Sequence, residues 1–132
     1  MTFAVFSSGS VYAQDADLPV EILGAWKVVA IGGKPLAEDA HIMVEFEETG
    51  TLDGSSNCNV MFGPIAFEQG MLQFGPFATK DKICSTEAYQ QEKRYLDFLT
   101  VSRGYMRMRE DSSLVLLDVN SRELLRLQEV DN

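Results

Sequence analysis

Two cysteines and one histidine are the first residues of this chain that could carry chemistry. Cys58 and Cys84 are the only cysteines, and a bridge between them would close a loop of about 26 residues, worth roughly 3 kcal/mol of stability. Two separate buried thiols are the alternative, because free cysteine packs as a small apolar side chain. With His41 as the only histidine and no CxxC pair, the donors are too few for a structural zinc site. We expect no metal and no cofactor.

Glu92 falls on the face of a predicted helix that should be buried. Residues 87–100 contain no Gly or Pro, and Ser85 or Thr86 can cap their N-terminal end. A carboxylate on the inward face must accept hydrogen bonds, find a partner charge or protonate. It is either a functional residue or, as we favour, a structural one that accepts backbone N–H groups of a nearby loop and fixes the helix. The predicted inward face consists of Ala88, Glu92, Tyr95, Leu96 and Leu99.

Catalysis is not indicated by the remaining polar residues. A serine triad needs a histidine between nucleophile and acid, whereas His41 sits at the edge of an ordinary strand beside acidic residues. The glycines are scattered through turns and form no phosphate-binding loop. We therefore expect that the protein is not an enzyme.

Composition favours one acidic, soluble domain. The chain has 132 residues, of which 45% are hydrophobic, enough for one core. Its formal net charge of -9 disfavours binding to nucleic acid or to anionic lipid. No apolar run approaches the roughly 20 residues of a transmembrane helix.

Residues 1–17 differ in composition from the rest. They contain no Lys or Arg, and place a short apolar stretch, Phe3 to Phe6, before a Ser/Gly patch and Val11-Tyr12-Ala13. This order is typical of the remnant of a secretory signal cleaved after Ala13, with the basic start missing. A disordered N-terminal extension is the alternative. We expect a folded domain at 18–130 and a periplasmic or secreted protein.

Short strands separated by turns are predicted for most of the domain. Apolar and polar residues alternate from Ile42 to Glu47, the period of a strand with one buried face. Residues 55–59 are instead rich in side chains that bond their own backbone, which predicts an ordered loop. Gly63-Pro64 and Gln69-Gly70 are expected to be turns. With the main helix, about eight strands are expected, at 26–31, 42–47, 60–62, 65–67, 71–74, 105–109, 114–119 and 124–127.

Four features follow one another along the chain. They are Leu23-Gly24-x-Trp26, Gly54-x-x-Asn57-Cys58-Asn59 followed by Gly63, Thr79-x-x-x-x-Cys84, and Glu92 with Tyr95-Leu96. From Leu18 to Leu127 the chain thereby resembles the META domain family, including its HslJ-like heat-shock and envelope proteins. The resemblance implies an α+β fold, mostly a curved antiparallel sheet that forms an incomplete β-barrel of about eight strands with one main α-helix.

The resemblance also assigns a structural motif by position. It implies a disulfide between Cys58 and Cys84, which would tie the start of the helix to the Asn-rich loop, with Glu92 pointing inward from the same helix. No cysteine near the N-terminus can carry a lipid anchor, so we expect a free periplasmic protein. The motif residues are Trp26, Asn57, Cys58, Asn59, Thr79, Cys84 and Glu92.

The family has no agreed biochemical activity, so function is predicted only coarsely. We expect a stress-related envelope protein that contacts other envelope proteins or unfolded peptides, with a monomer favoured. A module that binds a small apolar ligand in the barrel interior or a groove is the alternative, and a hydrolase is a less favoured one. Core packing is the favoured role for the aromatics that could line such a groove, which are Phe62, Phe67, Phe74, Phe77 and Tyr105.

Overall fold

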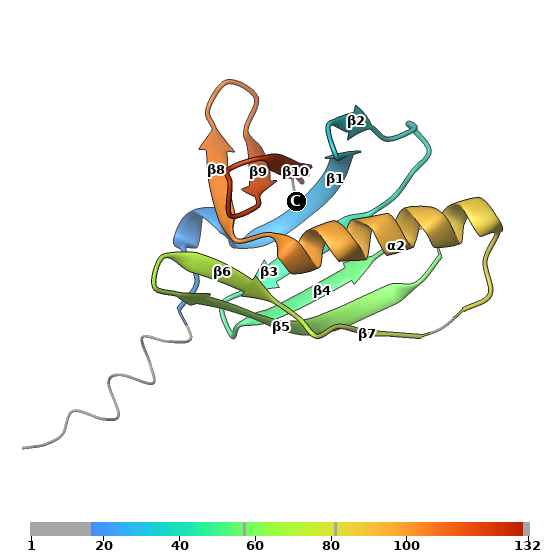
Figure 1. Ribbon diagram of the computed structural model, residues 1–132, viewed down its shortest axis with the longest axis horizontal. Coiled ribbons are helices and arrows are strands. Elements are labelled where there is room, and N and C mark those ends of the chain that lie inside the picture. The colour runs from blue at the N-terminus through green and yellow to red at the C-terminus, as the bar shows by residue number, and fades with distance from the viewer. Residues whose placement is uncertain (1–16, 57, 81, 131–132) are drawn as a thin grey trace, which may run out of the picture.

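The structure, a computed structural model, describes residues 17–56, 58–80 and 82–130 (Figure 1). The segment 1–16, on which the signal sequence was predicted, lies outside the described residues. In chain order the elements are η1 (Val20–Ile22), β1 (Gly24–Ile31), β2 (Lys34–Pro35), β3 (Met43–Glu47), β4 (Thr51–Ser55), β5 (Val60–Glu68), β6 (Met71–Phe74), β7 (Ala78–Thr79), α2 (Thr86–Val101), β8 (Gly104–Met108), β9 (Ser113–Leu117) and β10 (Glu123–Glu129).

The strands form one strongly curved antiparallel sheet. Its order is β6-β5-β4-β3-β1-β10-β9-β8, and the short strands β2 and β7 are added beside β1 and β5. The sheet curls until its two ends, β6 and β8, face each other across a seam. The Leu72 N–H donates to the Arg103 carbonyl (2.7 Å) there, and the rings of Phe67 and Tyr105 meet edge to face. The predicted incomplete barrel is therefore confirmed.

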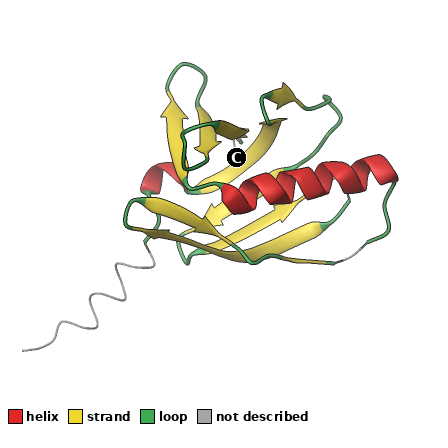
Figure 2. Cartoon of the chain, in the orientation of Figure 1, coloured by secondary structure: helices red, strands yellow, loops and turns green. Residues whose placement is uncertain are grey.

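Helix α2 is the one α-helix of the described residues, and it packs against β1, β6 and β10 (Figures 1 and 2). The Ser85 hydroxyl accepts the Ala88 N–H (3.1 Å), so the expected capping side chain does begin the helix. Tyr95 and Leu99 are buried under the helix, and Glu92 is buried with them. The remaining buried core comes mainly from inward residues of the strands, such as Val44 and Phe46.

Two predicted strands, 60–62 and 65–67, are one strand in the structure. The turn expected at Gly63-Pro64 is wrong, because β5 runs through both residues. What changes there is the neighbour of β5, which pairs with β7 before this point and with β6 after it. A Cβ atom on Gly63 would lie 2.6 Å from the Pro76 carbonyl oxygen. Gly63 is therefore needed where the chain between β6 and β7 passes close to β5.

No helix among the described residues is both long and apolar enough to cross a bilayer.

Candidate functional site: a polar network beside the disulfide

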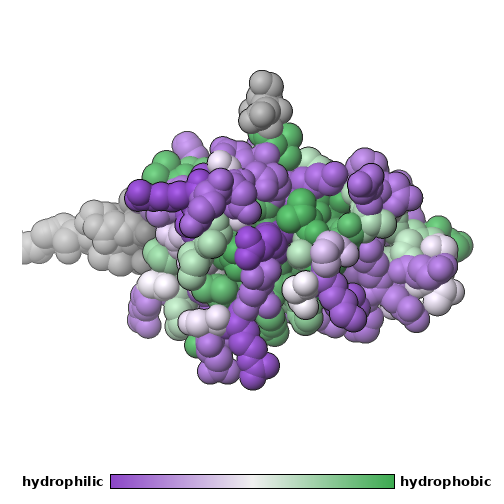
Figure 3. Space-filling view, turned by 90° about the horizontal axis from the view of Figure 1, so that it is seen from above, coloured by the Kyte–Doolittle hydropathy of each residue, from purple (hydrophilic) through white to green (hydrophobic). Residues whose placement is uncertain are grey.

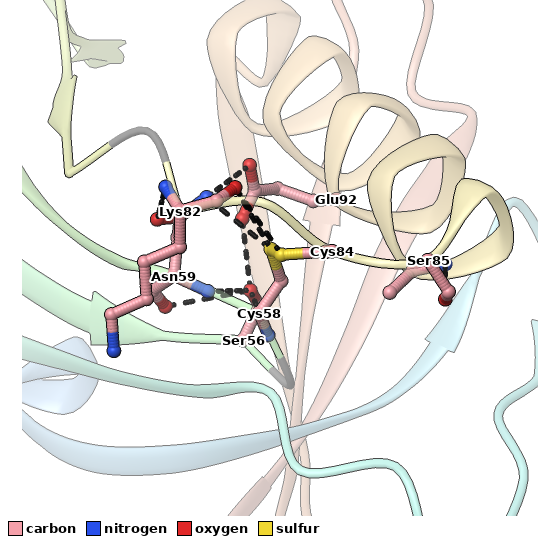
Figure 4. The surroundings of a disulfide bond; sticks show 8 residues. Ser56, Cys58, Asn59, Lys82, Cys84, Ser85 and Glu92 are labelled. Carbon is pink, nitrogen blue, oxygen red and sulfur yellow. Dashed lines mark hydrogen bonds between the residues drawn. A yellow bond between two sulfur atoms is a disulfide. The ribbon is translucent and has the colours of Figure 1, made fainter.

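A disulfide joins Cys58 to Cys84 (Figure 4), as the family resemblance implied. Cys58 lies in the loop between β4 and β5, and Cys84 directly precedes the cap of α2. The two Cα atoms are 5.8 Å apart. The bond therefore attaches the start of the helix to a loop of the sheet.

Glu92 lies two turns into α2 and faces the same loop. Its side chain is only 9% exposed, and each carboxylate oxygen accepts a hydrogen bond. Oε1 accepts from the Ser56 hydroxyl (2.9 Å), and Oε2 accepts from the Asn59 side-chain amide (3.2 Å). The loop thus supplies the donors that a buried carboxylate requires. These donors are side chains, whereas the sequence reasoning expected backbone N–H groups.

Ser56 organises the loop, and sequence reasoning did not single it out. Its hydroxyl oxygen accepts the backbone N–H groups of Cys58 (3.1 Å) and Asn59 (3.0 Å) while its proton is directed to Glu92. The Ser56 N–H in turn donates to the Asn59 carbonyl (2.7 Å). The signal that could have identified it is a serine placed two and three residues before the N–H groups it binds, the spacing of a side-chain turn.

Asn59 is the central residue of the network, and its side chain is buried. Its Oδ1 accepts the Lys82 N–H (2.9 Å) while its Nδ2 donates to Glu92, so the amide joins the helix to the segment before it. This fixes the orientation of the amide, because the reverse orientation would set an oxygen against the carboxylate and an NH₂ group against an N–H. The Lys82 carbonyl lies 3.5 and 3.8 Å from the two sulfurs, which carry no proton, so these are contacts only.

The chemical capacity of this network follows from its hydrogen bonds. A nucleophilic serine needs a free lone pair, whereas the Ser56 oxygen already accepts two N–H groups. Both oxygens of Glu92 are engaged as well. The arrangement holds helix, loop and disulfide together.

Other residues of the predicted motif lie apart from this network or cannot be placed. Asn57 falls outside the described residues. Thr79 lies on β7 opposite Met61. Trp26 is buried in the barrel, where its indole N–H donates to the Ile22 carbonyl (2.9 Å) and the Arg107 guanidinium lies 4.9 Å from its ring centre. Trp26 is thus a core residue whose ring also contacts a cation.

The five aromatics considered for a groove divide into two groups. Phe74 is buried, and Phe67, Phe77 and Tyr105 are partly buried against the core, so core packing accounts for these four. Phe62 is different, because 55% of its surface is exposed on the outer side of β5.

Titratable groups in the core are few. Burial raises the pKa of the Tyr95 phenol, whose hydroxyl has no hydrogen-bond partner among the described residues. Partial burial raises the pKa of Tyr105, and so do the negative charge of the nearby Glu21 carboxylate and the hydrogen bond that this carboxylate accepts from the phenol. His41 is exposed. The part of the chain that the structure describes contains no group of three acidic, histidine or cysteine side chains that could hold a metal ion.

Comparison with solved structures supports the fold. An NMR structure of a protein from Burkholderia xenovorans matches with a TM-score of 0.62 at 22% identity, covering 100% of this chain and 97% of that one. A crystal structure of a DUF4847 family protein from Bacteroides vulgatus matches with a TM-score of 0.59 at 15% identity, covering 86% of this chain and 96% of that one.

A further NMR structure matches with a TM-score of 0.61 at 18% identity. At these identities the likeness concerns the fold alone. No curated protein matches the chain. The family model described as META domain matches residues 20–131, nearly the whole of the described structure, and the chain therefore belongs to the META domain family.

Proposed function

We propose that this META domain protein is a non-catalytic, stress-related protein of the cell envelope that acts through contacts with other proteins or with unfolded peptides. The observation that carries the proposal is the use of Glu92 and Ser56, the pair most like a catalytic base and nucleophile, in structural hydrogen bonds. Both groups are engaged by the fold itself. A reaction would have to break these bonds before it could begin.

The disulfide supports the proposed location. Disulfides form and persist in oxidising compartments such as the periplasm, and are rare in the reducing cytoplasm. The bond between Cys58 and Cys84 joins parts of the chain that the fold needs together, which suits a protein that folds after export.

The barrel interior favours protein contacts over a small apolar ligand. Among the described residues, twenty buried apolar side chains form the core, and they include Trp26, Phe46 and Tyr95. Apolar side chains are also left on the outside, and Figure 3 shows such patches between hydrophilic residues on the face seen from above. The large exposed ones are Val20, Val60, Phe62, Met71, Ile83, Tyr89, Val101, Met106 and Val119.

An aggregation assay tests the proposal. Reduced insulin, whose B chain precipitates, is followed by light scattering with and without the purified chain. We expect slower precipitation at near-stoichiometric amounts, and the same effect from a folded Glu92→Gln variant. Absence of any effect on precipitation, or a hydrolytic activity that Glu92→Gln abolishes, would contradict the proposal.

A further inference from the structure

The outer face of β1, β3, β4 and β5 combines exposed apolar side chains with carboxylates. The strand register aligns two neighbouring rows of outward side chains across these four strands. The first row is Ala25, Glu45, Asp53 and Phe62. The second row is Lys27, Met43, Ser55 and Val60. We call these two rows, with Glu47 beside them, the outer acidic face.

A shallow depression of about 330 Å³ lies between the two rows. Its side-chain walls are Ala25, Met43, Glu45, Asp53 and Ser55. Ala25 and Ser55 are short, and they leave the space that longer neighbours enclose. Its volume is at the low end of the range for ligand sites, and it has room for one large apolar side chain of a partner. Phe62 and Val60, which are 55% and 40% exposed, extend the apolar surface at one end.

Like charges crowd this face. Glu45 and Asp53 are opposite each other on neighbouring strands. A hydrogen bond to the Asp53 carboxyl, followed by repulsion from its charge, raises the pKa of Glu47. None of the ion pairs among the described residues includes Glu45, Glu47 or Asp53. Lys27 lies on the same face but forms no ion pair with these carboxylates. A cationic group placed between Glu45 and Asp53 would relieve their repulsion.

We propose that the outer acidic face is a docking surface for a partner segment that carries Lys or Arg beside a large apolar side chain. The apolar side chain enters the depression, and the cation lies between Glu45 and Asp53. This inference rests on the proposed function, because it specifies the chemistry of the protein partner. A second copy of the chain is the wrong occupant, since a two-fold contact would set these carboxylates against each other. Anionic lipid is repelled for the same reason.

The test is an NMR titration of the uniformly ¹⁵N-labelled full chain with an acetylated peptide of alternating Lys and Phe. A matched peptide of alternating Glu and Phe is the control. We expect shift changes confined to β1, β3, β4 and β5 with the basic peptide, weakening as salt is added, and none with the acidic one. Equal binding of the two peptides, binding at another face, or no binding would overturn the proposal.

Surface variants make the test specific. Asp53→Lys should lower the affinity for the basic peptide by about tenfold or more, and Phe62→Ser should lower this affinity by a smaller factor. Glu110→Lys and Val119→Ser change exposed residues elsewhere and should leave binding unchanged. Equal effects of the test and control variants would contradict the proposed face. All four positions are on the surface, and dispersed amide spectra verify that each variant is folded.

Failure of this inference can be told apart from failure of the proposed function. If the chain delays insulin precipitation and Asp53→Lys delays it equally, protein contacts are made through another surface, and the outer acidic face is excluded. If the wild type has no effect on precipitation, the proposed function itself is wrong.

Discussion

The side-chain amide of Asn59 donates to Oε2 of Glu92 across 3.2 Å, from a loop of the sheet to the middle of the helix. The same amide accepts the Lys82 N–H through its oxygen, so one side chain bonds two segments that are distant in sequence. With the adjacent disulfide, this contact fixes how α2 lies against the barrel. The polar residues of the family motif therefore perform in this chain the task that apolar packing performs elsewhere in the core.

Replacing Glu92 should destabilise the fold. In Glu92→Gln one of the two loop donors faces an NH₂ group, and we expect a loss of about 1–3 kcal/mol in the free energy of unfolding. Glu92→Leu removes both acceptors and should cost more. Urea unfolding followed by circular dichroism measures these losses. Glu87→Gln, an exposed glutamate in the first turn of the same helix, should lose only a few tenths of a kcal/mol. Similar losses at Glu87 and Glu92 would disprove the special position of Glu92.

The variant Asn59→Asp keeps the shape of the side chain and changes one donor into an acceptor. At neutral pH it sets a second carboxylate against Glu92, so the variant should be clearly less stable than the wild type. On acidification the deficit should shrink, because a proton shared between the two carboxyls restores the hydrogen bond. Thermal unfolding at a series of pH values measures the deficit. A deficit that is independent of pH would show that the Glu92 contact is not its cause.

The disulfide should contribute to stability and to local order. Its loop of 26 residues corresponds to about 3 kcal/mol in the chain-entropy account. The free energy of unfolding of the double variant Cys58→Ser/Cys84→Ser should be lower than that of the wild type by about this amount. Amide hydrogen exchange should accelerate first around Ser56 and in the first turns of α2, which lose their tether. Unchanged exchange in both regions would contradict a role in anchoring the helix.

Asp111 should make stability depend on pH at the acidic end. Hydrogen bonds from the Ser113 hydroxyl and N–H, with a smaller attraction by Arg126, lower the pKa of its carboxyl below the usual 3.8. A lowered pKa in the folded state means that ionised Asp111 stabilises the fold above pH 3.8, and that this contribution is lost as the pH falls through the lowered value. The stability difference between wild type and Asp111→Asn should thus be full at neutral pH and vanish in strong acid. A difference that grows on acidification would have the opposite sign and refute this assignment.

Local patterns in the sequence predict much of the fold. The alternation from Ile42 to Glu47 and the cap at Ser85 depend on neighbouring residues only, and the structure contains both. The course of β5 was not predictable in this way, because Gly63-Pro64 has the composition of a turn. Its place inside a strand is set by the segment around Pro76, which approaches only in the folded chain.

The network around Glu92 was predictable in part. An inward carboxylate was evident from the helical period, and its structural reading agrees with the hydrogen bonds observed. The bond from Ser56 to Glu92 was not predictable, because the two residues are 36 apart in sequence. The sequence also did not predict that the Phe62 side chain points outward, because Val60-Met61-Phe62 is apolar throughout and shows no period of two. Pairing with Asp53 decides which side of β5 faces solvent.

A double-mutant cycle between Asn59 and Glu92 tests most directly whether the loop and the helix are held together as one unit. The free energies of unfolding of Asn59→Ala, Glu92→Ala and the double variant are compared with that of the wild type. We predict that the double variant loses less than the sum of the two single losses, by at least about 0.5 kcal/mol. Strictly additive losses would show that the two side chains act independently, and would contradict the account.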